Sequence, residues 1–222
     1  MKIKKLLKTL LISIPFLASC LTLSACNNSN KNNDAKLRSF ELCEQLNTFI
    51  RDIKSDGTIE EMEDIWFGKD ETKKVIDYSS SGENGTITFG SVLSFEPMGY
   101  ISGGKKMGFS TDLVYRFAKK YGYNVQFFDS VSHATCVTAV ASGRADFGGT
   151  CMSITDERRQ SGCFSDPYYK NEVVVLITKD TANSIESLDD LNGLDFGVAS
   201  GSTYSVYCNE RMPYSRVLEY NT

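Results

Sequence analysis

Hydroxyl and guanidinium groups gather in one short stretch of the sequence, residues 153–158. Ser153 and Thr155 can offer hydroxyl groups, and Arg158 follows Thr155 at a spacing that suits the first turn of a helix. The free N–H groups of such a turn favour an anion, and an arginine fork fits a carboxylate with two parallel hydrogen bonds. The stretch therefore predicts an anion site for a carboxylate. A surface turn with exposed arginines is the alternative interpretation of the same spacing.

Metal and nucleophilic chemistry have little support in the sequence. His133 is the single histidine of the chain, so a zinc cluster or a Ser-His-Asp triad lacks a second histidine or a base. We interpret His133 as a residue at the start of a helix. The sequence thus predicts no catalytic residue, no metal site and no cofactor.

Seven cysteines are present, two of them near the N-terminus. The others are Cys43, Cys136, Cys151, Cys163 and Cys208. This number is odd, and the spacing does not match that of metal ligands. A disulfide between Cys151 and Cys163 is conceivable, but buried free thiols are the preferred interpretation.

The N-terminal segment has the pattern of a targeting signal rather than of a folded element. A lysine-rich start precedes a mostly apolar run, and the run ends in LSAC at Cys26, which resembles the lipobox of bacterial lipoproteins. We predict a signal peptide at residues 1–25, lipidation of Cys26 and a polar tether at residues 26–34. Cys20 fits the same pattern, but apolar sequence follows it. An ordinary cleaved signal and an uncleaved anchor are the alternatives.

Composition and charge limit the possible partners. The formal net charge is −4, and without the four lysines of residues 1–25 the remaining 20 basic residues face 28 acidic ones, a charge of −8. A nucleic-acid partner requires a basic footprint, so we expect none. With 41% hydrophobic and 23% charged residues, the chain can bury a core.

Patterning predicts the elements that position the candidate site. Strands and helices alternate from residue 86, with strands at 86–92, 124–129 and 146–149 and helices at 110–121 and 132–142. Such alternation implies a parallel, doubly wound sheet. The alternation restarts after Tyr169, with strands at 172–178, 195–199 and 216–220 and helices at 187–191 and 202–209. We therefore predict an α/β chain with lobes at 86–169 and 170–222.

The part of the chain before the first lobe is predicted to be helical. Residues 35–55 carry apolar side chains at helical spacing, and Thr58 with Glu61 has the form of a capping box for a second, short helix. This helix is expected to end at residues 66–68. Residues 69–85 are polar and are predicted to form a linker.

Several motifs, in the right order, resemble those of the bacterial extracellular solute-binding proteins of family 3, the receptors of polar amino acid ABC transporters. They are GFSTDL at 108–113, SGRAD at 142–146, ITDER at 154–158, FSDPYY at 164–169, LDDLNG at 188–193 and GST at 201–203. The resemblance covers residues 86–222. It implies a periplasmic-binding-protein-like fold of two lobes with doubly wound sheets that close on one amino acid, with a hinge near residues 168–170.

The resemblance also assigns roles to residues. In the family, the arginine of the turn and donors from both lobes hold the α-carboxylate of the ligand. By position, Arg158 is the carboxylate clamp, Ser153 supplies a hydroxyl and a backbone contact, and Thr203 is a donor at a helix start. Phe95 matches the aromatic wall of the side-chain pocket, with a core position as the alternative, and Tyr100 is a weaker candidate for this wall.

The sequence departs from the family pattern at three points. Cys151 stands in the turn where the family commonly has glycine or serine, and Met98 replaces a usual phenylalanine, which softens the aromatic wall. The aspartate that binds the ligand ammonium in the family lies beyond Thr222. The second lobe is therefore expected to be incomplete.

Residues 35–68 resemble the C-terminal helices of the family, which return to the first lobe. They are interpreted as the remnant of a preceding tandem domain or as a permuted closing element, and an unrelated amphipathic extension is a further alternative. We hypothesise that they dock on the first lobe, because their apolar stripe needs a partner.

The resemblance implies a lipid-anchored receptor on the outer face of the bacterial membrane, in the cell envelope. Such a receptor binds a polar amino acid, with a mild preference for a basic one, and delivers it to the permease of an ABC importer. An enzyme on the same scaffold, similar to a dehydratase, is the alternative, although no paired carboxylates or activated nucleophile match it. A truncated fragment that does not bind is the other alternative.

Overall fold

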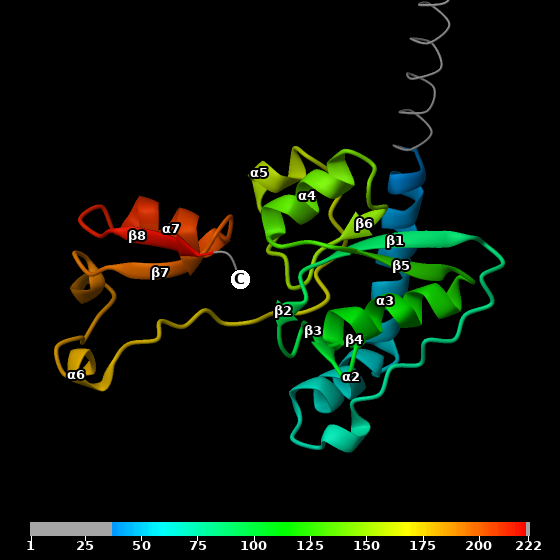
Figure 1. Cartoon of the computed structure of the whole chain (residues 1–222), viewed down its shortest axis with the longest axis horizontal. Coiled ribbons are helices and arrows are strands. Elements are labelled where there is room, and N and C mark those ends of the chain that lie inside the picture. Colours follow the sequence, from blue (N-terminus) through cyan, green and yellow to red (C-terminus); the bar gives the residue numbers. More distant parts are fainter. Residues whose placement is uncertain (1–36, 221–222) are drawn as a thin grey trace, which may run out of the picture. The chain divides into compact units, whose positions relative to one another are not determined.

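The computed structural model describes residues 37–220 (Figure 1). The predicted signal peptide, Cys20, Cys26 and the polar tether lie outside the described residues. The chain divides into two compact units, residues 1–41 and 42–222. The first contributes only the helical residues 37–41 to the described part, and all further elements belong to the second. Among the described residues, no helix is long and apolar enough to cross a membrane.

A three-stranded parallel sheet forms the centre of the predicted first lobe. Strand β1 (Thr86–Ser91) lies between β5 (Asn124–Asp129) and β6 (Phe147–Gly148). Helix α3 (Phe109–Lys120) leads into β5 and α4 (His133–Ala141) leads into β6, and Figure 1 shows these helices on opposite faces of the sheet. The predicted doubly wound α/β arrangement is confirmed here, although β6 is shorter than the predicted strand.

Glycine rather than serine begins helix α3. Gly108 is the N-cap residue, with φ of 116°, whereas Ser110, at which the helix was predicted to begin, lies inside the helix. A Cβ atom at Gly108 would approach the carbonyl oxygen of Met98 to 2.6 Å. The close backbone approach therefore requires glycine at this position, and the prediction for Ser110 is wrong. In α4, by contrast, Ser132, the first residue of the predicted helix, caps the helix by accepting a hydrogen bond from the backbone N–H of Thr135.

A second, antiparallel sheet was not predicted. It consists of β2 (Ser94–Phe95), β3 (Gly99–Ser102) and β4 (Lys105–Met107), in that order. These strands have two to four residues, so they are too short to show an alternating pattern in the sequence. The sheet carries both Phe95 and Tyr100.

The helices before the first lobe pack against it. The first helix, residues 42–55 of the second unit, and α2 (Thr58–Phe67) share one hydrophobic cluster with α3. Its fully or nearly fully buried members include Leu42, Phe49, Ile53, Ile59, Met62 and Trp66 from the N-terminal side and Phe109, Leu113 and Phe117 from α3. This packing agrees with the docking hypothesis for the described part of residues 35–68.

One local prediction in the N-terminal helices is wrong. Helix α2 has Gly57 as its N-cap residue and no side-chain cap bond of its own, so Thr58 does not form a capping box. The carboxylate of Asp56 instead accepts a hydrogen bond from the backbone N–H of Thr58 at 3.0 Å. Residues 69–85, predicted as a linker, contain a 3-10 turn at Glu71–Lys73 and no other helix or strand, and the side chain of Ile76 is buried.

The cysteine prediction is also corrected. A disulfide joins Cys43 to Cys163, so these two cysteines are not the free thiols that were preferred, and Cys163 does not pair with Cys151. Among the described residues, the free thiols are those of Cys136, Cys151 and Cys208. Sequence spacing could not reveal this pair, because its two residues are 120 positions apart.

The predicted second lobe contains a β-α-β unit. Strand β7 (Phe196–Ala199) and strand β8 (Val217–Tyr220) are parallel neighbours, and α7 (Thr203–Arg211) connects them. These three elements match the prediction closely. The short turns α6 (Lys179–Ala182) and η2 (Asp189–Leu191) precede the unit.

The predicted apolar strand at residues 172–178 is not formed. No described strand pairs with this run, and Val174 and Leu176 are 84% and 97% exposed. A strand requires a neighbour that takes up its backbone hydrogen bonds. The residues have high β-propensity, but propensity alone does not provide a neighbouring strand, so the predicted strand is absent.

Candidate functional site

The turn that carries the anion-site residues is helical, as its spacing predicted. Helix α5 (Asp156–Arg159) begins after Thr155, whose hydroxyl accepts a hydrogen bond from the backbone N–H of Arg158 at 3.2 Å. Two acidic residues in its first turn and two arginines in its last suit the helix dipole. The turn is therefore stabilised locally and holds the backbone of Arg158 in place.

The guanidinium of Arg158 bridges two backbone segments. Its Nη1 donates to the carbonyl oxygen of Ser153 at 2.8 Å, and its Nη2 donates to the carbonyl oxygen of Gly201 at 2.9 Å. Partial burial lowers the pKa of Arg158, which the negative charge of Glu157 opposes. A guanidinium has about five N–H donors, so these two bonds leave donor capacity for a further oxygen.

Two of the other predicted site residues meet beside this bridge. The hydroxyl oxygens of Ser153 and Thr203 are 3.5 Å apart. Thr203 is the first residue of α7, which Ser202 caps by accepting a hydrogen bond from the backbone N–H of Ser205. The structure thus brings Arg158, Ser153 and Thr203 together, with hydroxyl groups, a cation and a helix start in one place.

Cys151 lies at the start of the same turn in a strained backbone conformation. Its φ of 52° is the positive value that non-glycine residues seldom adopt, which fits its place where glycine is common. Its backbone N–H donates to the hydroxyl of Tyr168 at 3.3 Å, and that hydroxyl lies 2.9 Å from Oγ of Ser110. Burial raises the pKa of the Cys151 thiol, so the thiol is not activated as a nucleophile.

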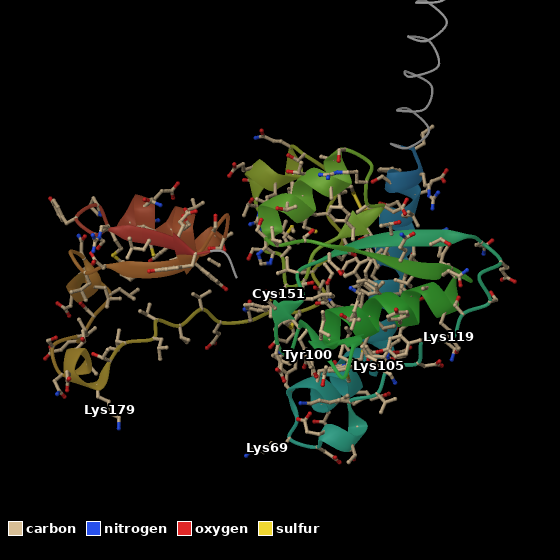
Figure 2. The ribbon with its side chains drawn as sticks, viewed as in Figure 1. Lys69, Tyr100, Lys105, Lys119, Cys151 and Lys179 are labelled. Atoms are coloured by element: carbon tan, nitrogen blue, oxygen red, sulfur yellow. A yellow bond between two sulfur atoms is a disulfide. The ribbon has the colours of Figure 1, made fainter. Side chains whose placement is uncertain are left out.

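The two aromatic candidates do not line one wall. Phe95 pairs with Gly99 and Ser94 pairs with Tyr100 across β2 and β3, so Phe95 and Tyr100 point to opposite faces of the ribbon. Tyr100, which is labelled in Figure 2, packs edge-on against Trp66 on the core side, with ring centroids 6.4 Å apart. Phe95 is 39% exposed. Phe95 therefore fits an exposed wall, and the placement of Tyr100 beside it is corrected.

Met98 also has a different place from the one predicted. It is 2% exposed and belongs to the hydrophobic cluster rather than to an exposed wall. Its carbonyl oxygen accepts the backbone N–H of Ser110 at 2.9 Å. Met98 thus contributes to the packing beneath the short antiparallel sheet.

Sequence reasoning missed the surroundings of His133. The residue begins α4 as predicted, and its Nε2 lies 2.9 Å from the carbonyl oxygen of Thr150, next to Cys151. Burial lowers the pKa of His133, and the positive charge of Arg158 lowers it further. The hydrogen bond between the His133 ring and the carbonyl of Thr150 holds the backbone at the entry to the turn.

The arrangement is suited to binding a carboxylate. It combines hydroxyl groups, an arginine and the start of a nine-residue helix, which all favour negative charge. Within residues 37–220, no group of three or more His, Cys, Asp or Glu side chains could hold a metal ion.

A protein-family model matches most of the two predicted lobes. The profile of the bacterial extracellular solute-binding proteins, family 3, matches residues 87–212. Two curated relatives are a probable histidine-binding protein of Campylobacter jejuni, 33% identical over 56% of this chain and 48% of the relative, and the arginine-binding extracellular protein ArtP of Bacillus subtilis, 34% identical over 56% of this chain and 47% of the relative. The chain spans about half the length of these curated relatives.

A similar solved structure is the ancestral amino acid-binding protein AncCDT-1, described as a precursor of cyclohexadienyl dehydratase. The two share 27% sequence identity with a TM-score of 0.59, over 65% of this chain and 67% of the other. This likeness supports the periplasmic-binding-protein-like α/β fold that the sequence motifs implied.

Proposed function

Because the chain belongs to the bacterial extracellular solute-binding proteins, family 3, we propose that it binds a polar amino acid outside the cytoplasm and delivers it to the permease of an ABC importer. The observation that carries this proposal is the guanidinium of Arg158, which lies beside the hydroxyl groups of Ser153 and Thr203. Its two contacts come from parts of the chain that are 5 and 43 residues away. A ligand carboxylate at this point would join the two segments.

The binding step is electrostatic and requires no bond making. Arg158 would accept the α-carboxylate on its free donors, while Ser153 and Thr203 would donate their hydroxyl protons. Charge-assisted hydrogen bonds of this kind contribute about 1.5–3 kcal/mol each. Opening and closing would occur about a hinge near residues 168–170.

A basic amino acid is the preferred ligand in this proposal. Phe95 presents an exposed ring on which a cationic side chain would gain about 0.5–2 kcal/mol. The acidic balance of the chain also favours a cation. The names of the histidine- and arginine-binding relatives point the same way.

Binding without turnover is favoured over an enzyme on the same scaffold. The curated relatives are named as binding proteins, although AncCDT-1 is described as a precursor of a dehydratase. At the Arg158 turn, Cys151 is not activated and His133 is engaged with the carbonyl of Thr150. Neither group is free to act as a general base there.

The carboxylate clamp is tested with a thermal-shift screen of the purified protein against the twenty amino acids. A ligand at a hundredfold excess over its Kd stabilises a protein by about 2.7 kcal/mol, which corresponds to a rise in Tm of about 5–10 °C at this chain length. Arg158→Ala should abolish that rise. The matched control is Arg159→Ala, which removes the neighbouring, exposed arginine and should leave the rise intact.

Three outcomes separate the alternatives. Equal stabilisation of the parent and of Arg158→Ala would remove Arg158 from the site. No stabilisation by any amino acid would favour the non-binding fragment. If chromatography shows that a stabilising ligand is consumed, the enzyme is favoured.

We also propose that Cys26 is the lipid-anchored residue and that the protein is held on the outer face of the membrane. The support is the LSAC sequence that ends at Cys26 and the polar tether after it. In cells fed with labelled fatty acid, Cys26→Ser should lose the label and Cys20→Ser should keep it. The reverse pattern would assign the anchor to Cys20, and label on neither protein would exclude lipidation.

A further inference from the structure

One face of the first helix follows the segment that leaves the Arg158 turn. The contacting residues of the helix are spaced by four, four and three positions, so they share a face, and they are Cys43, Asn47, Arg51 and Lys54. All of their partners lie within five residues, at 163–167. The helix therefore contacts this segment along its length rather than at a single point.

Three of these contacts are polar. The backbone N–H of Asp166 donates to the side-chain oxygen of Asn47 at 2.7 Å, and the carboxylate of Asp166 pairs with Arg51 at 3.0 Å. The ammonium of Lys54 donates to the carbonyl oxygen of Pro167. The side chains of Arg51 and Asp166 are 58% and 44% exposed, so their ion pair contributes little on its own.

The fourth contact is covalent. The disulfide joins Cys43 of the helix to Cys163 of the segment, 120 positions away, and it opens only by exchange with another thiol, whereas the exposed polar contacts can exchange with water. The disulfide is therefore the main element of the contact, and the polar bonds set its alignment.

The segment held in this way leads directly into a second set of contacts. The ring of Tyr169 stacks on Phe67 of α2 at 5.0 Å, and the ring of Tyr168 stacks on Phe109 of α3 at 6.1 Å. Residues 163–169 are thus fixed by the first helix and by two further helices. Helix α5, with Arg158, lies immediately before this segment.

We propose that the first helix is a restraint on the segment that leaves the first lobe, and that the Cys43–Cys163 disulfide is its reducible latch. With the latch closed, residues 163–169 and the adjacent Arg158 turn are held in the binding arrangement. With the latch open, the exposed ion pair and two hydrogen bonds remain between the segment and the helix. Any consequence of the latch for ligand binding rests on the proposed function, whereas the restraint on residues 163–169 does not.

The opening step is an ordinary thiol–disulfide exchange. A dithiol attacks one sulfur of the disulfide, a mixed disulfide forms, and its second thiol closes a ring and releases the protein thiol. The protein gains two electrons and two protons as two thiols, and the dithiol becomes a cyclic disulfide. Cys163 is exposed, so its sulfur is accessible to the reductant.

Hydrogen exchange of the purified full chain, followed by mass spectrometry, tests the latch. Amides of residues 160–169 should exchange at least about tenfold faster after reduction with dithiothreitol, or in the double variant Cys43→Ser/Cys163→Ser, because local opening becomes easier. Strands β1 and β5 should be unchanged. Cys208→Ser, which replaces a buried free thiol on α7, is the matched control and should behave as the parent.

Each other result would overturn the latch. Unchanged exchange at residues 160–169 would show that the disulfide does not restrain the segment, and equally faster exchange in β1 and β5 would show a general stabiliser. Absence of a linked Cys43–Cys163 peptide from protein prepared without reductant would remove the bond itself. If no amino acid binds the parent, the exchange result still decides the latch, and only the proposed function fails.

Discussion

The hydroxyl of Tyr168 connects two parts of the candidate site. It lies 2.9 Å from Oγ of Ser110, inside α3, and accepts the backbone N–H of Cys151 at 3.3 Å. Cys151 has a positive φ, which costs about 1–3 kcal/mol. A backbone in such a conformation persists only where its surroundings hold it. The Tyr168 hydroxyl is therefore a positioning group for the turn that carries Ser153.

Tyr168→Phe should destabilise the protein and weaken ligand binding together. Loss of the hydroxyl leaves two polar groups without this partner, at a cost of about 1–3 kcal/mol, and each kcal/mol lowers Tm by about 2–4 °C at this size. Thermal unfolding and the ligand-induced shift measure the two effects. Tyr169→Phe is the control, because it keeps the ring that stacks on Phe67 and leaves the Tyr168 bonds intact. A parent-like Tm and ligand shift in Tyr168→Phe would contradict this role.

The residues of the site could be predicted only in part. Local spacing predicted the helical turn of Arg158, because Thr155 caps it three positions away. The second acceptor of Arg158, the carbonyl of Gly201, is 43 residues away, and spacing contains no information about such a partner. The same reason explains why the placement of Tyr100 failed. Its face of the sheet is set by pairing with Ser94 in strands too short to predict.

At the scale of elements, prediction succeeded where the signal was periodic. The five-element alternation of β1, α3, β5, α4 and β6 follows the sequence pattern, and so does the β7-α7-β8 unit. It failed where backbone geometry decides, as at Gly108, where close approach to Met98 places the start of α3. The start of α2 is a further case, because Gly57 is its N-cap residue and the Asp56 carboxylate accepts the backbone N–H of Thr58.

The N-terminal helices show how an apolar stripe finds its partner. Trp66 of α2 is 1% exposed, and its indole N–H donates to the carboxylate of Asp112 at 3.0 Å. Asp112 also pairs with Arg116 at 3.1 Å, and burial raises the pKa of Asp112. A buried carboxylate is tolerated where such bonds offset its desolvation. The periodicity predicted the buried stripe, but the polar contact that aligns α2 on α3 depends on their packing.

At the scale of the whole molecule, burial is uneven along the chain. The fully buried large side chains, such as Trp66, Phe109 and Phe117, all come from residues 42–169. Beyond residue 170, the buried apolar residues of the described chain are Leu191, Cys208 and Met212. The chain also spans about half the length of the curated relatives it matches. Stability therefore depends mainly on the N-terminal helices and the β5-β1-β6 sheet.

The uneven burial leaves the apolar run at residues 172–178 exposed, and the effect of this exposure can be measured directly. A window of five to seven apolar, β-prone residues without proline favours association between chains. Val174→Thr combined with Leu176→Thr should therefore lower light scattering on concentration or mild heating. Because these side chains are 84% and 97% exposed, we expect the free energy of unfolding to change by no more than about 0.5 kcal/mol. Val131→Thr is the control, since Val131 is a 68% exposed valine outside the run, and it should leave scattering unchanged. A loss of stability of the size seen for core substitutions would instead show that the run is packed, and unchanged scattering would show that it does not drive association.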